Sequence, residues 1–410
     1  MYLITGSTGF LGRELLGRLL IANKSSEIIV IVRAPSKTDA KNRVDSILNY
    51  LFNKDRASEL SKRVHIYNGD VTKYNFGLST EDYDFVIQNT SAIFHCAATT
   101  DLGFNTKEAF EINVKGTKEV LSLANQIIKV NPDLKFNYVS TAYVAGNTTG
   151  IVTPDYLNVN GNFRNPYEQS KAQAESLIRE QVGSINTTIF RPSIIVGESE
   201  TGRTSAFNVI YIPAKLIAKG LFSYFPASQS TIFDIVPIDY VADAIVYLSH
   251  LNLQSGTCLH LTSGVGREAL ITEILEVIIS TYNLLKNKKE KTLPLPQLLN
   301  PELLALIHHS FQNSFNSALV TMKNIEQRIS KHISVIQHLV PFVPYMGKIP
   351  QFDNILTVNL SGNVIGHPPL FKNYSENIFR YCFETNWGRK EIVFENQNIW
   401  EKNFSKIMSN

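Results

Sequence analysis

The feature that most constrains this chain is a glycine-rich segment, residues 5–12, with the sequence Thr-Gly-Ser-Thr-Gly-Phe-Leu-Gly. It lies between an apolar stretch that reads as a strand, residues 2–5, and residues 11–22, where leucines recur at helical spacing. Between strand and helix, three such glycines allow a tight turn, close approach of a pyrophosphate, and close packing of the helix. An ordinary glycine-rich turn is the alternative, but this context favours a dinucleotide site. The candidate cofactor contacts here are Thr5, Gly6, Thr8, Gly9, Phe10, Leu11 and Gly12.

The first half of the chain alternates short apolar runs with helical patterns. The apolar runs occupy residues 28–32, 64–67, 92–95, 136–139 and 188–190. Helical periodicity lies between them, for example over residues 108–130 and 167–181. Because continuous apolar runs suit parallel strands covered on both faces, the alternation predicts an α/β fold, a Rossmann-like doubly wound parallel sheet.

The pattern changes after Pro192. A polar loop at residues 199–205 precedes two expected strands, 232–236 and 258–261, with a helix expected over residues 240–251. Helical periodicity then dominates, followed by proline-rich, irregular sequence. We therefore expect a nucleotide-binding core over residues 1–262, with a substrate-region insertion near residues 192–231. Residues 263–410 are expected to form a smaller, mainly helical substrate or accessory region.

The end of the second expected strand indicates which cofactor is bound. An acidic residue there binds the ribose 2′-hydroxyl of NAD, whereas an arginine accommodates the 2′-phosphate of NADP. This strand is followed by Arg33 and has no acid, and Arg13 after the last glycine adds positive charge. A surface position is the alternative for each arginine, but the pattern favours NADP (NADPH). Further candidate cofactor contacts are Asp70 and Val71 after another strand and the small residues Ala97 and Ala98.

A hydroxyl-bearing strand end and a Tyr-x-x-x-Lys pair are the candidate catalytic groups. Tyr167 and Lys171 are four residues apart on an expected helix, so they share a face. A nearby ammonium would lower the pKa of the tyrosine, and the lysine could also bind the nicotinamide ribose. The expected strand over residues 136–139 ends next to Ser140 and Thr141, either of which could hold a substrate oxygen. Asn113 is the fourth candidate, although a mid-helix asparagine often has only a structural role.

Taken in order, these motifs resemble the extended short-chain dehydrogenase/reductase superfamily over roughly residues 1–262. Within it the chain is most similar to the fatty acyl-CoA reductases and the thioester reductase domains of carrier-protein enzymes. This narrower resemblance is carried by Val-Arg-Ala at residues 32–34, Val-Ser-Thr-Ala-Tyr at 139–143, Phe-Arg-Pro-Ser-Ile-Ile-Val-Gly-Glu-Ser at 190–199, and Asp-Ile-Val-Pro-Ile-Asp-Tyr-Val-Ala-Asp at 234–243.

The resemblance implies specific roles. It places the catalytic hydroxyl at Thr141 rather than Ser140, and adds Pro192 and Ser193 to the cofactor contacts. It implies hydride transfer from NADPH to an acyl thioester, with Tyr167 as proton donor and Lys171 setting its pKa, to give an aldehyde and, after a second reduction, an alcohol. The carrier would be coenzyme A or an acyl carrier protein. A sugar-nucleotide epimerase or dehydratase, a hydroxysteroid-type dehydrogenase, and a non-catalytic NADP-binding regulator are the alternatives.

Composition restricts the remaining possibilities. The 39 basic and 36 acidic residues give a net charge of +3, too weak to indicate a nucleic-acid partner. Three observations favour a cytoplasmic protein. The three cysteines are widely separated, no apolar run reaches about 18–20 residues, and the first segment has no basic leader. The apolar residues 303–307 and 340–346 could line an acyl tunnel, contact a membrane surface, or form ordinary core. The basic run at residues 286–291 reads as a solvated segment, with an acidic carrier protein as the alternative partner. We expect no metal site, since His308, His309, His332 and His338 lack ligand spacing.

Overall fold

A parallel sheet forms the centre of the computed structural model. The structure describes residues 1–100, 102, 105–159, 161–221, 224–287, 290–299, 340–347, 349–390, 392 and 399–409. In these ranges the main sheet has seven parallel strands in the order β12-β7-β5-β4-β1-β2-β3. Its strands are β1 (Tyr2–Thr5), β2 (Ile28–Val32), β3 (Val64–Asn68), β4 (Ala92–His95), β5 (Lys135–Val139), β7 (Asn186–Pro192) and β12 (Thr257–Leu261). The predicted doubly wound α/β fold is confirmed.

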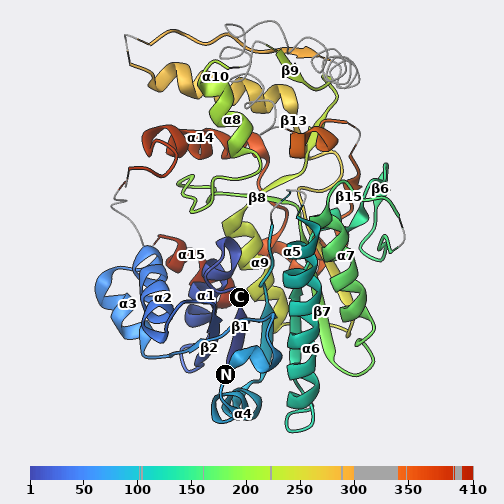
Figure 1. Cartoon of the computed structure of the whole chain (residues 1–410). Coiled ribbons are helices and arrows are strands. Elements are labelled where there is room, and N and C mark those ends of the chain that lie inside the picture. The colour runs from blue at the N-terminus through green and yellow to red at the C-terminus, as the bar shows by residue number, and fades with distance from the viewer. Residues whose placement is uncertain are drawn as a thin grey trace, which may run out of the picture.

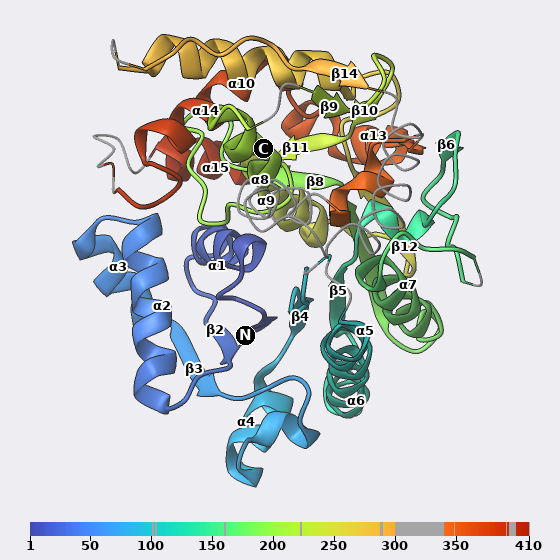
Figure 2. The same cartoon turned by 45° about the horizontal axis from the view of Figure 1, so that its top comes forward.

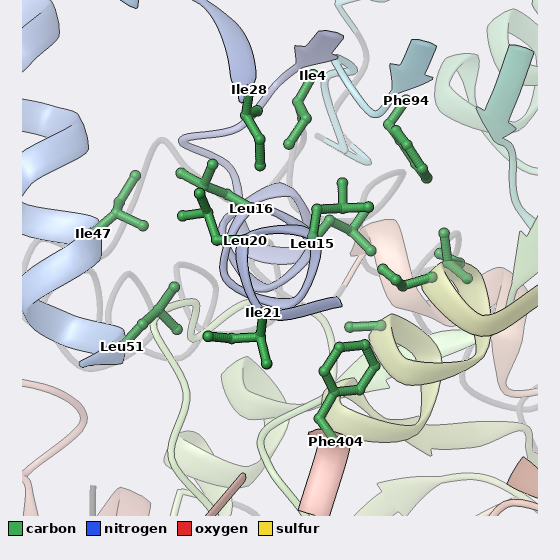
Figure 3. Packing of buried hydrophobic residues seen from close by; sticks show 14 of the residues in the cluster. Ile4, Leu15, Leu16, Leu20, Ile21, Ile28, Ile47, Leu51, Phe94 and Phe404 are labelled. Atoms are coloured by element: carbon green, nitrogen blue, oxygen red, sulfur yellow. The ribbon is translucent and has the colours of Figure 1, made fainter. Parts of the chain in front are cut away.

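Helices cover both faces of the sheet because successive strand residues point to opposite sides. On one face Ile4 and Ile28 pack with α1 (Phe10–Ala22), α2 (Lys37–Leu51), α3 (Lys54–Ser61) and α9 (Ile238–His250). Figure 3 shows Ile4 and Ile28 above Leu15, Leu16 and Leu20 of α1. On the other face Leu3 and Ile29 pack with α4 (Thr80–Asn89), α6 (Gly116–Ile127) and α7 (Pro166–Arg179). The apolar runs read from the sequence are therefore strands buried on two sides.

Two expected elements are divided in the structure. The helix expected over residues 108–130 consists of α5 (Thr106–Phe110), a π-helical turn η2 (Glu111–Lys115) and α6. The single strand expected over residues 232–236 is wrong: it is β10 (Ile232–Phe233) and β11 (Ile235–Pro237). Between the two strands lies the buried Asp234, whose carboxylate accepts a hydrogen bond from the Ser263 backbone N–H. The two strands on either side of Asp234 pair with different partner strands. β10 pairs with β13 (Ala269–Leu270), and β11 pairs with β8 (Ile194–Val196).

A second layer lies above the carboxyl ends of the sheet strands (Figures 1 and 2). Its helices are α8 (Tyr211–Ala218), α10 (Ile271–Leu285) and α14 (Ser375–Glu384), which share one apolar core. The 3-10 turn η4 (Val340–Tyr345) also contributes to this core. The short pairs are β9 (Tyr224–Pro226) with β14 (Gln297–Leu299) and β6 (Ile151–Val152) with β15 (Gln351–Phe352). The remaining short turns are η1 (Tyr74–Gly77), η3 (Ala142–Ala145) and η5 (Phe371–Asn373).

The last helices of the chain return to the sheet domain. α13 (Ile355–Ile365) packs on α9 and β12, and α15 (Ile399–Ser409) packs on α1 and α9. The Trp400 indole N–H donates to the Leu51 carbonyl at 3.1 Å, and Phe404 lies in the core beneath α1 (Figure 3). Residues 263–410 thus contribute to both layers. Within the described ranges no helix is both long enough and apolar enough to cross a membrane.

Candidate active site

The glycine turn after β1 is shaped by two close backbone approaches. Gly6 has a φ of +72°, and a Cβ there would lie 2.6 Å from the Ala97 backbone nitrogen. A Cβ on Gly12 would lie 2.1 Å from the Gly6 carbonyl oxygen. Since real Cβ atoms do not approach so closely, only glycine lets β1, the end of β4 and the start of α1 meet here. These are the roles that the glycine spacing predicts.

A large cavity lies at the carboxyl ends of β1, β2 and β4. Its volume is about 830 Å³. Parallel α/β sheets bind ligands at this edge, where the strand order reverses between β1 and β4. The predicted cofactor residues that line it are Gly6, Thr8, Gly9, Arg33, Asp70, Val71, Ala97 and Ala98.

A second cavity of about 320 Å³ adjoins the first and shares Gly6, Gly9 and Ala98 with it. The predicted residues that line it are Phe10, Leu11, Gly12, Thr141, Tyr167, Lys171, Pro192 and Ser193. Its other walls are mostly apolar and include side chains from α8, α10 and the segment 340–346, although Thr100, Ser140 and Asn208 also line it. The sheet domain therefore contributes a polar end, and the second layer an apolar end.

Thr5, Arg13 and Asn113 line neither cavity. The Thr5 hydroxyl lies 2.7 Å from His95 Nδ1 beneath the glycine turn. Asn113 Oδ1 accepts from the Thr99 N–H at 2.9 Å, and its Nδ2 donates to the Ser170 hydroxyl at 2.9 Å. Asn113 therefore ties the loop after β4 to α7 between Tyr167 and Lys171.

At the polar end Lys171 is buried and Tyr167 is half-buried, but their partners differ from those expected. Burial raises the pKa of Tyr167 to about 12, and a hydrogen bond with the Thr141 side chain partly offsets this. Burial lowers the pKa of Lys171 to about 8, while the Glu175 carboxylate acts in the opposite sense. The expectation that Lys171 lowers the pKa of Tyr167 is not met, because the lysine amino group donates instead to Tyr138 OH and the Val139 carbonyl.

The choice between Ser140 and Thr141 follows from their hydrogen bonds. Ser140 Oγ donates to Glu175 Oε2 at 2.6 Å, and Glu175 pairs with Arg191 at 2.6 Å. The Thr141 hydroxyl is instead hydrogen-bonded to the Tyr167 side chain and has two longer contacts, to the Pro192 carbonyl at 3.4 Å and the Tyr143 N–H at 3.3 Å. Thr141 is therefore the hydroxyl able to turn toward a ligand in the cavity, next to Tyr167.

The end of β2 carries a third charged group that the sequence reasoning missed. Arg43, in the middle of α2, donates from Nη1 to the Arg33 carbonyl at 2.7 Å. Arg43 and Arg13 line a hollow beside Thr8, and the Arg13 guanidinium lies 5.4 Å from the Tyr50 ring centre. A lysine or arginine eleven residues after a strand has no special position in the sequence, so only the packing of α2 could reveal Arg43.

The other sequence candidates have less specific surroundings. Phe342, Tyr345 and Met346 of the apolar segment 340–346 line the second cavity. Residues 303–307 and the four histidines considered as metal ligands lie outside the described residues, and so do Lys288 and Lys289 of the basic run. In the described ranges His, Cys, Asp and Glu form no group of three suited to a metal ion.

A doubly wound sheet with a glycine turn at the switch point and a Tyr-Lys pair on the adjoining helix defines a dinucleotide-binding oxidoreductase. The family described as male sterility protein, a family of NAD-binding domains, matches residues 4–245. The chain belongs to this family.

Named relatives agree with this assignment. Human fatty acyl-CoA reductase 1 is 27% identical over 440 residues, covering 93% of this chain and 83% of that protein. Among solved structures, the terminal R domain of the myxalamid PKS-NRPS pathway superposes with a TM-score of 0.75 at 22% identity, covering 95% of this chain and 92% of that one. The reductase (R) domain of a nonribosomal peptide synthetase from Mycobacterium tuberculosis has a TM-score of 0.67 at 21% identity, with the same coverage. These two structures share the fold of this chain.

Proposed function

We propose that this protein uses NADPH to reduce an acyl thioester with a long apolar chain to the aldehyde, with cleavage of the C–S bond and release of the free thiol, and that a second NADPH reduces the aldehyde to the alcohol. The observation that carries the proposal is the continuity of the second cavity. One end holds Thr141, Tyr167 and Lys171, and most of the remaining wall consists of apolar side chains. The similarity to fatty acyl-CoA reductases supports the same substrate class.

The apolar walls favour an acyl chain over the alternative substrates. Ile217 of α8, Ile274 and Ile278 of α10, and Met346 all face this cavity. Each methylene buried against such walls contributes about 0.8 kcal/mol. The hydroxyls of a sugar would instead lose water without gaining hydrogen-bond partners there. The cavity therefore argues against a sugar-nucleotide epimerase or dehydratase.

The residues of the first cavity fit a dinucleotide. At Gly6 and Gly12 a Cβ would fill the turn. Because these residues are glycines, backbone N–H groups at the start of α1 stay accessible to a phosphate group. Gly6, Thr8, Gly9 and the strand-end residues Asp70 and Val71 would hold the cofactor there. When bound, NADPH supplies the hydride for the reduction.

We propose that Arg33, Arg43 and Arg13 select NADPH over NADH. The three cluster around the end of β2, where no acid is available to bind a ribose 2′-hydroxyl. Asp39 lines the same hollow, but its carboxylate accepts a hydrogen bond from Ser36 at the start of α2. A 2′-phosphate fits the fork geometry of guanidinium groups.

Replacing Arg43 with alanine tests this selection. We expect the Kd for NADPH to rise by about 10- to 150-fold, since one charged hydrogen bond contributes about 1.5–3 kcal/mol, while the Kd for NADH stays the same. Fluorescence titration with each cofactor measures both constants. Arg56→Ala is the control, because Arg56 pairs with Glu59 and Glu401 at 2.8 and 3.1 Å and lines neither the cavities nor the hollow. Equal losses for NADPH and NADH would contradict the selection.

The polar groups have separable roles in the proposed reaction. The Thr141 and Tyr167 hydroxyls would donate to the thioester carbonyl oxygen, where negative charge develops. A tyrosine whose pKa lies near 12 is protonated at neutral pH and can give its proton to that oxygen. The Lys171 ammonium, still largely charged at pH 7, would hold the ribose hydroxyls beside it.

The proposal is tested by NADPH oxidation with purified protein and a panel of acyl-CoA thioesters of increasing chain length, with the products identified. We expect oxidation that depends on the acyl thioester, increases with chain length and yields aldehyde or alcohol. The same panel on acyl carrier protein distinguishes the two carriers. Turnover of a sugar nucleotide, or tightly retained NAD with no thioester reduction, would overturn the proposal.

We also propose that the protein acts in the cytoplasm. The three cysteines, Cys96, Cys258 and Cys382, are all free thiols, as suits a reducing compartment. Fractionation of cells followed by detection with a specific antibody would test the location. Recovery in a secreted fraction would contradict it.

A further inference from the structure

We propose that Tyr138 is a positioning residue for Lys171, holding its ammonium group on β5 so that one N–H remains directed to the cofactor. The inference rests on the proposed function only in taking Lys171 as the cofactor-binding lysine. It concerns a residue that lies outside the Tyr-x-x-x-Lys motif and reads from sequence as an ordinary core position of a strand.

The contacts between the two side chains are close and fully enclosed. Lys171 Nζ donates to Tyr138 OH at 2.9 Å and to the Val139 carbonyl at 2.7 Å. The same nitrogen lies 4.4 Å from the Tyr138 ring centre. Tyr138 is 1% exposed and Lys171 3%. Because an ammonium has three donors, two are used by β5 and one is left for the cavity that Lys171 lines.

The Tyr138 hydroxyl is itself held by a buried hydrogen-bond network of neutral groups. Thr117 is its hydrogen-bond partner, and Thr117 Oγ1 donates to the Asn113 carbonyl at 2.6 Å. His95 Nε2 lies 3.0 Å from Thr117 Oγ1, and His95 Nδ1 lies 2.7 Å from the Thr5 hydroxyl. Burial lowers the pKa of His95 to about 3, so the ring is neutral at ordinary pH. This hydrogen-bond network thus extends from Lys171 to Thr5, the residue that begins the glycine turn.

The other groups facing Lys171 do not replace this contact. Glu175 and Tyr167 come from α7, and His95 and Cys96 from the end of β4. Glu175 is charged, but it is hydrogen-bonded to Arg191, Arg179 and Ser140. His95, Cys96 and Tyr167 are neutral at pH 7, because burial lowers the pKa of the imidazole and raises those of the thiol and the phenol. Direct stabilisation of the ammonium therefore comes from Tyr138 OH and the Val139 carbonyl.

Removal of the Tyr138 hydroxyl should make the lysine lose its proton at lower pH. We expect Tyr138→Phe to shift the alkaline limb of log(kcat/KM) against pH downward by about one unit, the size expected from losing one hydrogen bond to a charged group. At pH 6, where Lys171 is protonated in both proteins, the two rates should be within about twofold. The Kd for NADPH, measured by fluorescence across the same pH range, should show the same shift.

A matched control separates this effect from simple packing. Tyr240 on α9 is also buried, and its hydroxyl has no hydrogen-bond partner in the described part of the chain, so Tyr240→Phe should leave the limb in place. If Tyr138→Phe does not fold, Tyr138→Leu takes its place with the same expected shift. Tyr138→His, which keeps a hydrogen-bond acceptor, should return the limb toward its original position.

Two outcomes would overturn the inference. One is an equal loss of activity at every pH with an unmoved limb, as expected if Tyr138 only packs; the other is a profile identical to that of the unmodified protein. The NADPH titration requires no thioester. A shifted titration without any thioester reduction by the unmodified protein would therefore uphold the role of Tyr138 while rejecting the proposed substrate.

Discussion

At the scale of single residues, one physical cause acts on the two central side chains in opposite senses. Burial disfavours charge, so it raises the pKa of Tyr167 to about 12 and lowers that of Lys171 to about 8. The tyrosine is kept in the protonated form that a proton donor needs. The lysine keeps its charge at neutral pH only with the support of neighbouring acceptors.

Tyr167→Phe tests the first of these roles. We expect kcat to fall by about 10²–10⁴, the usual contribution of a positioned acid, because the ring is retained and only the proton donor is lost. The Kd for NADPH should change by less than twofold. Steady-state rates and cofactor titration on the same preparation measure both, with the melting temperature as a check on folding. Full turnover by this variant would reject Tyr167 as the acid.

At the scale of elements, the turn η4 connects the apolar layer to the catalytic helix. Tyr345 OH donates to Glu168 Oε1 at 2.7 Å and accepts from Asn165 Nδ2 at 2.7 Å. Asn165 is the N-cap of α7, where its side chain accepts from the Glu168 N–H. These two residues lie on either side of Tyr167 in the chain, so a segment near the C-terminus sets how the helix bearing the acid begins.

Tyr345→Phe should disturb that helix start without changing the shape of the cavity. The lost hydroxyl leaves the buried Glu168 and Asn165 side chains each without one partner, which costs about 1–3 kcal/mol of stability. We expect a lower melting temperature and a lower kcat, with an unchanged Kd for NADPH. Calorimetry and steady-state rates check this. An unaltered kcat together with a lowered melting temperature would restrict Tyr345 to a structural role.

At the scale of the whole molecule, one of the returning C-terminal segments contacts the main sheet through a buried neutral histidine, His260. His260 on β12 lies 2.9 Å from the Asp353 carbonyl through Nδ1 and 3.3 Å from Arg191 Nη1 through Nε2. Burial, followed by the Arg191 charge, lowers the pKa of His260 to about 3. Since the unfolded imidazole binds its proton near pH 6.5, the stability from this group is complete above that pH and is lost progressively as the pH falls toward 3.

His260→Gln isolates this contribution. The variant should show a shallower dependence of unfolding free energy on pH between about 3 and 6.5, by at most about 1.4 kcal/mol per pH unit. Urea denaturation of both proteins at several pH values gives the difference. Asp234 and Asp243 change the unfolding free energy with pH in the opposite sense, because burial raises the pKa of each to about 6. Both proteins contain these two residues, so their effect cancels in the difference. Parallel curves would show that His260 does not titrate as described.

The sequence was sufficient for those features that depend on local chemistry. Strands buried on both faces, the glycine turn, and the i, i+4 placement of Tyr167 and Lys171 each follow from short-range spacing, and the structure has them at those positions. Local spacing does not explain the divided strand at Asp234. Its backbone partner, Ser263, lies 29 residues away in the chain.

The tertiary structure alone decided which groups meet. Periodicity does not specify the partner of a side chain from a distant element, so the contact of Lys171 with Tyr138 and that of Arg43 with Arg33 were not predictable. The same holds for the apolar end of the second cavity, which brings together residues 217, 274 and 346. The sequence by itself determined a dinucleotide-binding core and its candidate acid. The packing of the second layer on that core decided the shape and polarity of the site, because burial and contact depend on the whole fold.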